Sequence, residues 1–242
     1  MLSEMGEIRS LAEVRRQLHS CADPEKALIL QGFFKTGPGQ YGEGDKFLGV
    51  VVPRIRRIAG KAGSLSLSQV IVLLKSEFHE ERLLALLVLV SKYNVADERE
   101  RRRIYDLYLR HTRYINSWDL VDLSAHHIVG AFLSDKSRRP LYKLARSSRL
   151  WERRIAMIST FYFIRRQDLT DTFNLADRLL GDEHDLMHKA VGWMLREAGK
   201  RDAAALKKFL GCRYNRMPRT MLRYAIERFP RRLRQAYLKG IA

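Results

Sequence analysis

The sequence has little cysteine, and this scarcity excludes two classes of protein. Only Cys21 and Cys212 occur, far apart and with no metal-type partners near them in the sequence. Such a pair makes neither a disulfide scaffold nor a metal cluster of the usual spacing. The first residues, MLSEMGEIRS, also lack the apolar core of a signal peptide. We therefore expect a protein of the reducing cell interior, in the cytoplasm.

Long apolar runs and helix-breaking residues are also scarce. No run of 18 uncharged apolar residues exists, which argues against a membrane-spanning helix. Proline and glycine number only 6 and 15, while hydrophobic residues make up 46% of the chain. That composition excludes a disordered chain, because it allows a sizeable core. With 242 residues, the chain fits one domain, which we expect to span residues 1–242.

Acidic residues are outnumbered, with 27 Asp and Glu against 45 Lys and Arg, a net charge of +18. An excess of that size attracts polyanions. Many of the basic residues are arginines, which suit bidentate contacts with phosphate. Nucleic acid is therefore the partner that we expect. A membrane surface is a weaker alternative, since no segment combines a basic face with a purely apolar one. The other alternative is a basic surface that is merely solvated.

Apolar residues recur with the helical period of 3.6 almost everywhere, and convincing alternation with period 2 occurs nowhere. This pattern predicts an all-α protein, with helices of roughly 10 to 18 residues joined by short polar connectors. One irregular stretch stands out, KTGPGQYGEGDKF (Lys35 to Phe47). Its glycines and its proline would break any helix, so we expect a loop there, after the second helix.

The polar breaks are regular enough to suggest an internal repeat. When the second helices of successive pairs are aligned, the anchors are Arg82, Trp118, Arg154, Lys189 and Arg223, at spacings of 36, 36, 35 and 34 residues. A repeated pair of antiparallel helices explains these spacings. Such pairs stack into a superhelical solenoid whose second helices line a concave face, the usual place for an extended ligand.

Basic residues gather in three of these repeats, within Arg99 to Arg113, Lys136 to Arg154 and Tyr214 to Lys239. Successive repeats would therefore present positive charge. A basic concave face of this kind could hold the backbone of a nucleic acid duplex.

One short stretch places two acids and a tryptophan in this basic chain, INSWDLVDLSAHH (Ile115 to His127). We expect Asn116 to cap a helix beginning at Ser117, and Asp119 to complete the capping pattern. Trp118 and Asp122 then lie one turn apart on the same face.

For each of these two side chains, a purely structural role is the alternative to a functional one. Trp118 also begins an apolar stripe with Val121, Ala125, Ile128 and Phe132, which would make it a core residue. Asp122 lies too far along for a helix N-terminus. It is therefore either one member of an ion pair with an arginine or an anion placed where a positive charge develops.

The sequence resembles the DNA alkylation repair glycosylase family, which is built from HEAT-like repeats (the AlkD family). The resemblance covers nearly the whole chain. Four ordered segments carry it: FFKTGPGQYGEGDKFLGVVVPRIRRIA (Phe33 to Ala59), INSWDLVD (Ile115 to Asp122), WERRIAMIS (Trp151 to Ser159) and KAVGWMLREAGK (Lys189 to Lys200). The resemblance implies an all-α solenoid that acts on double-stranded DNA carrying alkylated bases, and hence an association with the nucleoid.

In that family a W-D-x-V-D motif supplies a tryptophan and an aspartate, a W-x-x-R motif supplies an arginine, and a G-W-x-L-R-E motif supplies a second tryptophan. By resemblance these residues are Trp118, Asp122, Arg154 and Trp193. The implied activity is that of a DNA glycosylase of base excision repair, which hydrolyses the N-glycosidic bond of cationic purines such as 3-methyladenine or 7-methylguanine. The alternative is a non-catalytic solenoid that binds DNA or RNA.

The chemistry of such a bond suits these side chains. A purine alkylated at N3 or N7 is already a cation and leaves without being protonated. The sugar then becomes oxocarbenium-like, and a carboxylate within reach stabilises it and orients a water. We expect Asp122 to do this, and Trp118 and Trp193 to add cation–π stabilisation. Arg154 would hold a phosphate of the lesion strand. Its alternative is an ion pair with Glu152 or Asp122, and the alternative for Trp193 is a core position.

Further DNA contacts are expected at Lys189 and Arg153, and at Tyr41, Gln40 and Lys46 in the glycine-rich loop. His126 and His127 lack the context of a metal site. No lysine is marked as a Schiff-base nucleophile, so we expect a monofunctional enzyme. We expect no metal and no cofactor, no membrane partner and a monomeric state.

Overall fold

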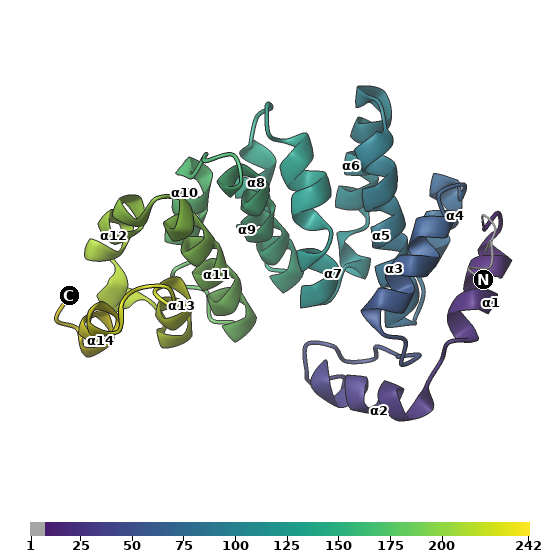
Figure 1. The fold of residues 1–242 in the computed structure, drawn as a ribbon, viewed down its shortest axis with the longest axis horizontal. Coiled ribbons are helices and arrows are strands. Elements are labelled where there is room, and N and C mark those ends of the chain that lie inside the picture. Colours follow the sequence, from purple (N-terminus) through teal and green to yellow (C-terminus); the bar gives the residue numbers. More distant parts are fainter. Residues whose placement is uncertain (1–7) are drawn as a thin grey trace, which may run out of the picture. The chain divides into compact units, whose positions relative to one another are not determined.

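The computed structural model describes residues 8–242, which fold into α-helices joined by short loops (Figure 1). No β-strand occurs among these residues. A single parallel bridge between Lys46 and Phe78 is the nearest approach to one. The predicted all-α fold is thus confirmed. The chain divides into two compact units, one ending at Ser124 and the other running from Ala125 to Ala242.

Among residues 8–124, the first unit has seven α-helices and the short 3-10 helix Thr112–Tyr114. The α-helices are α1 (Leu11–His19), α2 (Pro24–Phe33), α3 (Val52–Lys61), α4 (Leu67–Leu74), α5 (His79–Val95), α6 (Glu98–Arg110) and α7 (Trp118–Asp122). The loop predicted between Lys35 and Phe47 lies between α2 and α3 and is irregular as expected. It uses left-handed backbone at Gly39 and Gly44, with φ of 71° and 81°, a conformation that glycine adopts without strain.

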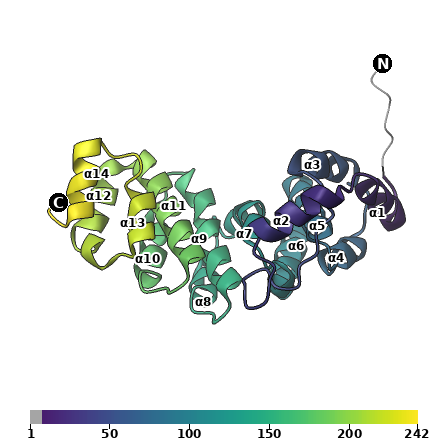
Figure 2. The ribbon, with the colours of Figure 1, turned by 90° about the horizontal axis from the view of Figure 1, so that it is seen from below.

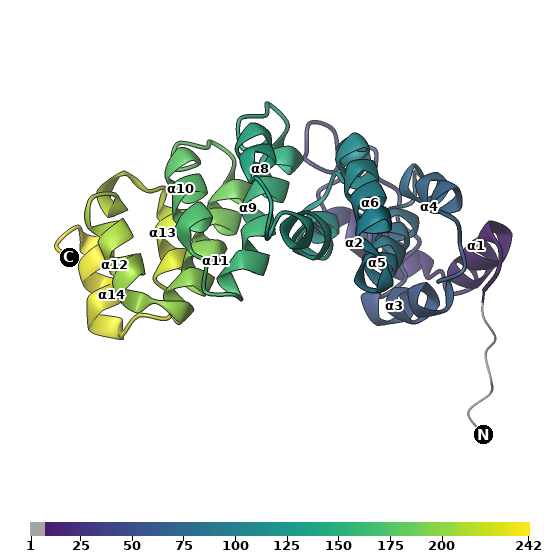
Figure 3. The same cartoon turned by 90° about the horizontal axis from the view of Figure 1, so that it is seen from above.

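The core of the first unit surrounds α5, which packs against α3, α4, α6 and α7. Every residue from His79 to Leu89 is buried. From Leu83 to Leu89 this follows from the run LLALLVL, which is apolar on all sides of the helix. Figure 2 views the face of this unit across which α2 lies, and Figure 3 views it from the side of α4 and α6.

The second unit begins with a π-helical segment and continues through seven α-helices. They are the π-helix His126–Gly130, then α8 (Arg139–Leu144), α9 (Leu150–Ile164), α10 (Thr170–Arg178), α11 (Asp185–Arg201), α12 (Ala203–Gly211), α13 (Arg219–Ala225) and α14 (Arg231–Lys239). Within this unit α11 packs between α9 and α13 (Figure 1). Helix α8 packs against α9, α12 packs against α11, and α10 packs against both α9 and α11.

Two glycines allow the close helix contacts of the second unit. A Cβ atom on Gly130 would lie 2.3 Å from the carbonyl oxygen of Ser159, and one on Gly192 would lie 2.5 Å from that of Met221. Real Cβ atoms do not approach backbone so closely, so only glycine lets the π-helix meet α9 and lets α11 meet α13 at these distances.

The same hydrogen bonds recur where three loops enter helices, and they support an internal repeat. In each set, the side chain of the first residue accepts a hydrogen bond from the backbone N–H of the residue two positions later. The basic side chain six positions after the first residue donates a hydrogen bond to the backbone carbonyl of that first residue. The three sets are Ser76, Phe78 and Arg82 before and in α5, Ser147, Arg149 and Arg153 before and in α9, and Asp182, His184 and His188 before and in α11.

This pattern corrects the alignment of the repeat. The residue of α9 that matches Arg82 is Arg153 rather than Arg154, and that of α11 is His188 rather than Lys189. The sequence alignment is thus displaced by one residue in both helices, because periodicity alone does not show which basic side chain turns back into the loop. The expected helix lengths were also wrong in places, since α7, α8 and α13 have only five, six and seven residues.

Candidate active site

The short helix α7 carries Trp118 at its first residue and Asp122 at its last. One helical turn separates them, as the sequence predicts, so both side chains point from the same side of the helix. Both are partly exposed. The other members of the predicted apolar stripe, Val121, Ala125, Ile128 and Phe132, are buried. Trp118 is therefore more accessible than the rest of its stripe.

Phenylalanines at the end of α2 cover part of the Trp118 indole. The ring of Phe34 stacks on it, with centroids 5.3 Å apart and 9° between the planes. Phe33 meets it edge-on at 6.0 Å and is itself 62% exposed. Trp118 packs in this way against the small core cluster of Ala27, Phe34 and Phe47. One face of the indole is thus fixed by the protein.

The predicted helix cap at Asn116 is wrong. The N-cap residue is Ser117, and its side chain makes no capping bond within the described chain. The Asn116 amide donates instead to Oδ1 of Asp45, at 2.9 Å. Asp119 is buried, and its Oδ2 lies 2.8 Å from Nε2 of His79. Both side chains therefore have partners from distant segments, which local sequence patterns do not reveal.

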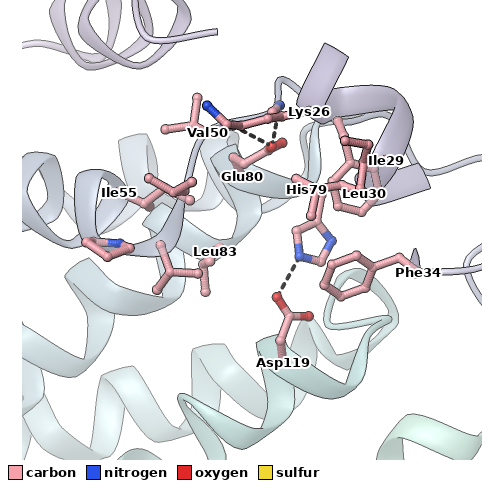
Figure 4. Close-up of a pocket in the computed structure, with 15 residues that line it drawn as sticks. Lys26, Ile29, Leu30, Phe34, Val50, Ile55, His79, Glu80, Leu83 and Asp119 are labelled. Atoms are coloured by element: carbon pink, nitrogen blue, oxygen red, sulfur yellow. Dashed lines mark hydrogen bonds and ion pairs between the residues drawn. The ribbon is translucent and has the colours of Figure 1, made fainter. Parts of the chain in front are cut away.

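His79 is the centre of this group, and no sequence pattern predicts this role. Its side chain is buried, its Nδ1 lies 3.6 Å from Oδ2 of Asp45, and Figure 4 shows its contact with Asp119. Burial acts to lower the pKa of His79, but the Asp119 carboxylate outweighs it, with help from Asp45, and raises the pKa to about 9. His79 is thus an imidazolium at neutral pH, and it lowers the pKa of Asp119 in spite of the burial that opposes ionisation.

Asp122, at the other end of α7, lies near the buried phenol of Tyr108. The Tyr108 hydroxyl shares a 2.9 Å hydrogen bond with Oγ of Ser124. Burial raises the pKa of Tyr108, and the negative charge of Asp122 raises it further. The phenol therefore stays protonated beside the carboxylate.

A mostly apolar pocket of about 360 Å³ lies beside His79 in the first unit (Figure 4). Its walls come from α2, α3, α5 and the segment before α3, with His79 and Asp119 among the lining residues. Glu80 also lines it, and its carboxylate accepts from the backbone N–H groups of Leu48, Gly49 and Val50 at 2.8–3.2 Å. Glu80 thus holds the segment that leads into α3.

Trp193 lies on α11 in the second unit and is partly exposed. Its Nε1 donates to Oε1 of Glu197 at 3.2 Å, and its ring lies 6.0 Å from that of Phe161. Lys200 and Arg196 also contact Glu197, at 2.7 and 3.4 Å. The indole of Trp193 is therefore held by a carboxylate whose own position is fixed.

His126 backs this group from the π-helix. Its ring stacks on Phe161 at 5.2 Å with 17° between the planes, and its Nδ1 is buried without a hydrogen-bond partner among residues 8–242. Burial is the largest cause that lowers the pKa of His126 to about 3, and the neighbouring His127 and Arg165 add to it. His126 is therefore a neutral imidazole at neutral pH.

The two adjacent arginines of α9 make different contacts. Arg154 is 4% exposed, and its Nη1 donates to the carbonyl of Leu186 at 2.5 Å. Arg153 makes an ion pair with Asp182 at 2.6 Å and donates to the carbonyls of Ser147 and Ser148. These contacts position both guanidinium groups in the second unit, and their roles in DNA binding remain predictions.

The remaining predicted DNA contacts lie at or near the surface. Lys189 pairs with Asp185 at 2.7 Å, and Lys46 pairs with Glu77 at 2.8 Å. Gln40 is exposed and accepts from the N–H of Gly37, while Tyr41 is partly exposed. Their contacts with DNA also stay predictions.

Residues 8–242 contain no helix that is both long and apolar enough to cross a membrane. Nor do these residues gather three or more His, Cys, Asp or Glu side chains as a metal ion would require.

A comparison with protein families assigns the class of protein. The model of the DNA alkylation repair enzyme family matches residues 14–229, so the chain belongs to that family. Among solved structures, it is similar to a predicted DNA alkylation repair enzyme from Enterococcus faecalis. The TM-score is 0.68 and the identity 14%, and the match covers 87% of this chain and 97% of the other. At that identity the likeness concerns the fold. A comparison with curated proteins finds no match.

Proposed function

We propose that the protein is a monofunctional DNA glycosylase, which hydrolyses the N-glycosidic bond of cationic alkylated purines in double-stranded DNA. Purines of the 3-methyladenine and 7-methylguanine type are the proposed substrates. One observation carries the proposal: in a chain of the alkylation repair family with a net charge of +18, α7 presents the Asp122 carboxylate one turn from the Trp118 indole.

The reaction needs little help at the base. The alkylated purine leaves with the electron pair of the C1′–N bond and becomes neutral. Water then adds to C1′ and releases its proton to solvent, which leaves an abasic site. Asp122 stabilises the positive charge on the sugar and orients this water.

Two indole rings would assist the same step. Trp118 and Trp193 would contribute cation–π stabilisation to the oxocarbenium-like sugar, about 1–2 kcal/mol each when water is excluded. Phe34 stacks on Trp118 and Glu197 accepts from the indole N–H of Trp193, so both rings are held in place, which supports this role. Arg154, and with it Arg153 and Lys189, would hold the phosphates of the lesion strand. Gln40, Tyr41 and Lys46 would touch DNA from the glycine-rich loop.

Asp122→Asn tests the proposal. We expect the rate of base release to fall about 10²- to 10³-fold, because one preorganised electrostatic contact is lost, while DNA affinity is largely kept. The measurement is single-turnover release of free 7-methylguanine from methylated duplex DNA, with the product identified by chromatography.

Asp106→Asn is the matched control. It makes the same change of charge at an exposed aspartate of α6 that pairs with Arg102, and it should leave the rate unchanged. If the wild-type protein releases no base, the glycosylase assignment fails. A non-catalytic solenoid that binds DNA or RNA then becomes the better description.

A further inference from the structure

The helix that carries Trp118 and Asp122 cannot hold its own position. α7 has five residues and, within the described chain, no side-chain cap. Isolated helices shorter than about 12–15 residues are marginal in water. Its orientation must therefore be set by contacts from other segments.

The glycine-rich loop supplies one of these contacts. Asp45 accepts from the Asn116 amide through Oδ1 at 2.9 Å and from Nη2 of Arg82 through Oδ2 at 2.6 Å. One carboxylate thus ties the residue two positions before Trp118 to α5. Gly44, with φ of 81°, provides the left-handed turn that brings Asp45 to this place.

His79 supplies the second contact. Its imidazolium lies 2.8 Å from Asp119, the residue that directly follows Trp118, and 3.6 Å from Asp45. Arg82 and Glu80 are its charged neighbours on α5, and Lys26 of α2 lines the same pocket. Two carboxylates from different segments therefore flank one buried cation. Its hydrogen bond orients Asp119, and its charge acts on Asp45, which Arg82 and Asn116 hold in place.

Aromatic rings supply the third contact. The His79 ring stacks on Phe47 at 4.6 Å and meets Phe34 at 4.9 Å. Phe34 in turn lies flat against Trp118. Phe47 ends the glycine-rich loop, so this loop contributes both an acid and a ring to the same group.

We propose that Asp45 and His79 are positioning residues, through which the glycine-rich loop and α5 set the orientation of Trp118 and Asp122. The loop thereby acts on the reaction from within the protein, in addition to any contact with DNA. This inference rests on the proposed glycosylase function for its kinetic consequence, but the orientation of Trp118 can be measured without any substrate.

The kinetic test compares Asp45→Asn with the control Asp106→Asn. We expect the single-turnover rate with a duplex holding one 7-methylguanine to fall about 10- to 100-fold for Asp45→Asn, since a displacement of about 1 Å can cost that much. The DNA dissociation constant, measured by fluorescence anisotropy, should change less than about twofold. Asp45→Glu, which keeps the charge, should recover part of the rate.

The spectroscopic test uses Trp118 as the only tryptophan, after Trp151→Phe and Trp193→Phe. In this background Asp45→Asn should increase acrylamide quenching of Trp118 about twofold, because a loosened indole is more accessible. Circular dichroism checks folding. If Asp45→Asn does not fold, Asn116→Ala decides the matter, with the same directions and smaller changes.

Wild-type rate and wild-type quenching in the Asp45 variant would overturn the inference. A slower rate with unchanged quenching would overturn it as well, because Asp45 would then act by another route than positioning. If the wild-type protein releases no base, the proposed function fails, and the quenching result alone decides whether Asp45 positions Trp118.

Discussion

Trp118 in the first unit and Trp193 in the second are each backed by a phenylalanine and a histidine, but the two histidines differ in charge. Trp118 lies on Phe34, which contacts the imidazolium of His79. Trp193 lies near Phe161, which stacks on the neutral His126. Tryptophan, phenylalanine and histidine thus follow one another in the same order in both units. The histidine is a cation in the first unit and neutral in the second.

The neighbours of each histidine account for the difference. Burial lowers the pKa of both rings. Asp119 and Asp45 reverse this effect at His79, whereas His127 and Arg165 reinforce it at His126. A buried histidine therefore takes its charge from the sign of its neighbours rather than from burial alone.

Replacing each histidine with phenylalanine should give the largest difference between the two units, measured as the loss of unfolding free energy. His79→Phe removes the cation paired with the buried Asp119 carboxylate, and breaking a buried pair in this way costs about 3–5 kcal/mol of unfolding free energy. His126→Phe keeps a ring and removes a nitrogen without a partner, so we expect a change within about 0.5 kcal/mol or a gain. Urea unfolding of both variants measures the difference, and equal losses would contradict it.

The pH dependence of stability should separate the same two residues. His79 has a raised pKa in the folded state, so its contribution is complete below about pH 6.5 and is lost as the pH rises through about 9. His126 has a lowered pKa, so its neutral form favours folding above about pH 6.5, and this contribution is lost as the pH falls towards 3.

Each slope is at most about 1.4 kcal/mol per pH unit. Urea midpoints measured from pH 4 to pH 10 should show the alkaline loss reduced in His79→Phe and the acid loss reduced in His126→Phe. Identical profiles for the two variants would show that the charge states are not opposite.

The support of Trp193 by Glu197 should give the smallest effect. Glu197→Gln weakens the acceptor of the indole N–H and the contacts with Lys200 and Arg196. These groups are partly exposed, so we expect a loss of about 1 kcal/mol or less. Emission of Trp193, as the only tryptophan after Trp118→Phe and Trp151→Phe, should shift, while the exposed Glu183→Gln should leave it unchanged.

Sequence patterns predicted the fold class and the irregular loop, and they placed Trp118 and Asp122 one turn apart. They failed where a side chain depends on a distant segment. Asn116 was expected to cap α7 but bonds Asp45, which lies 71 residues earlier. Asp119 lies in the first turn of α7 as expected, but it pairs with His79, 40 residues earlier, instead of completing a cap.

The sequence by itself determined the all-α architecture, the basic character and the sites at which charge and aromatic rings occur, because these follow from periodicity and composition. Only the tertiary structure decided which histidine is charged, which arginine turns back into its loop, and what holds the short helix α7. These properties depend on distances of a few ångströms between segments far apart in the chain, where the energy of a charge changes steeply with its neighbours.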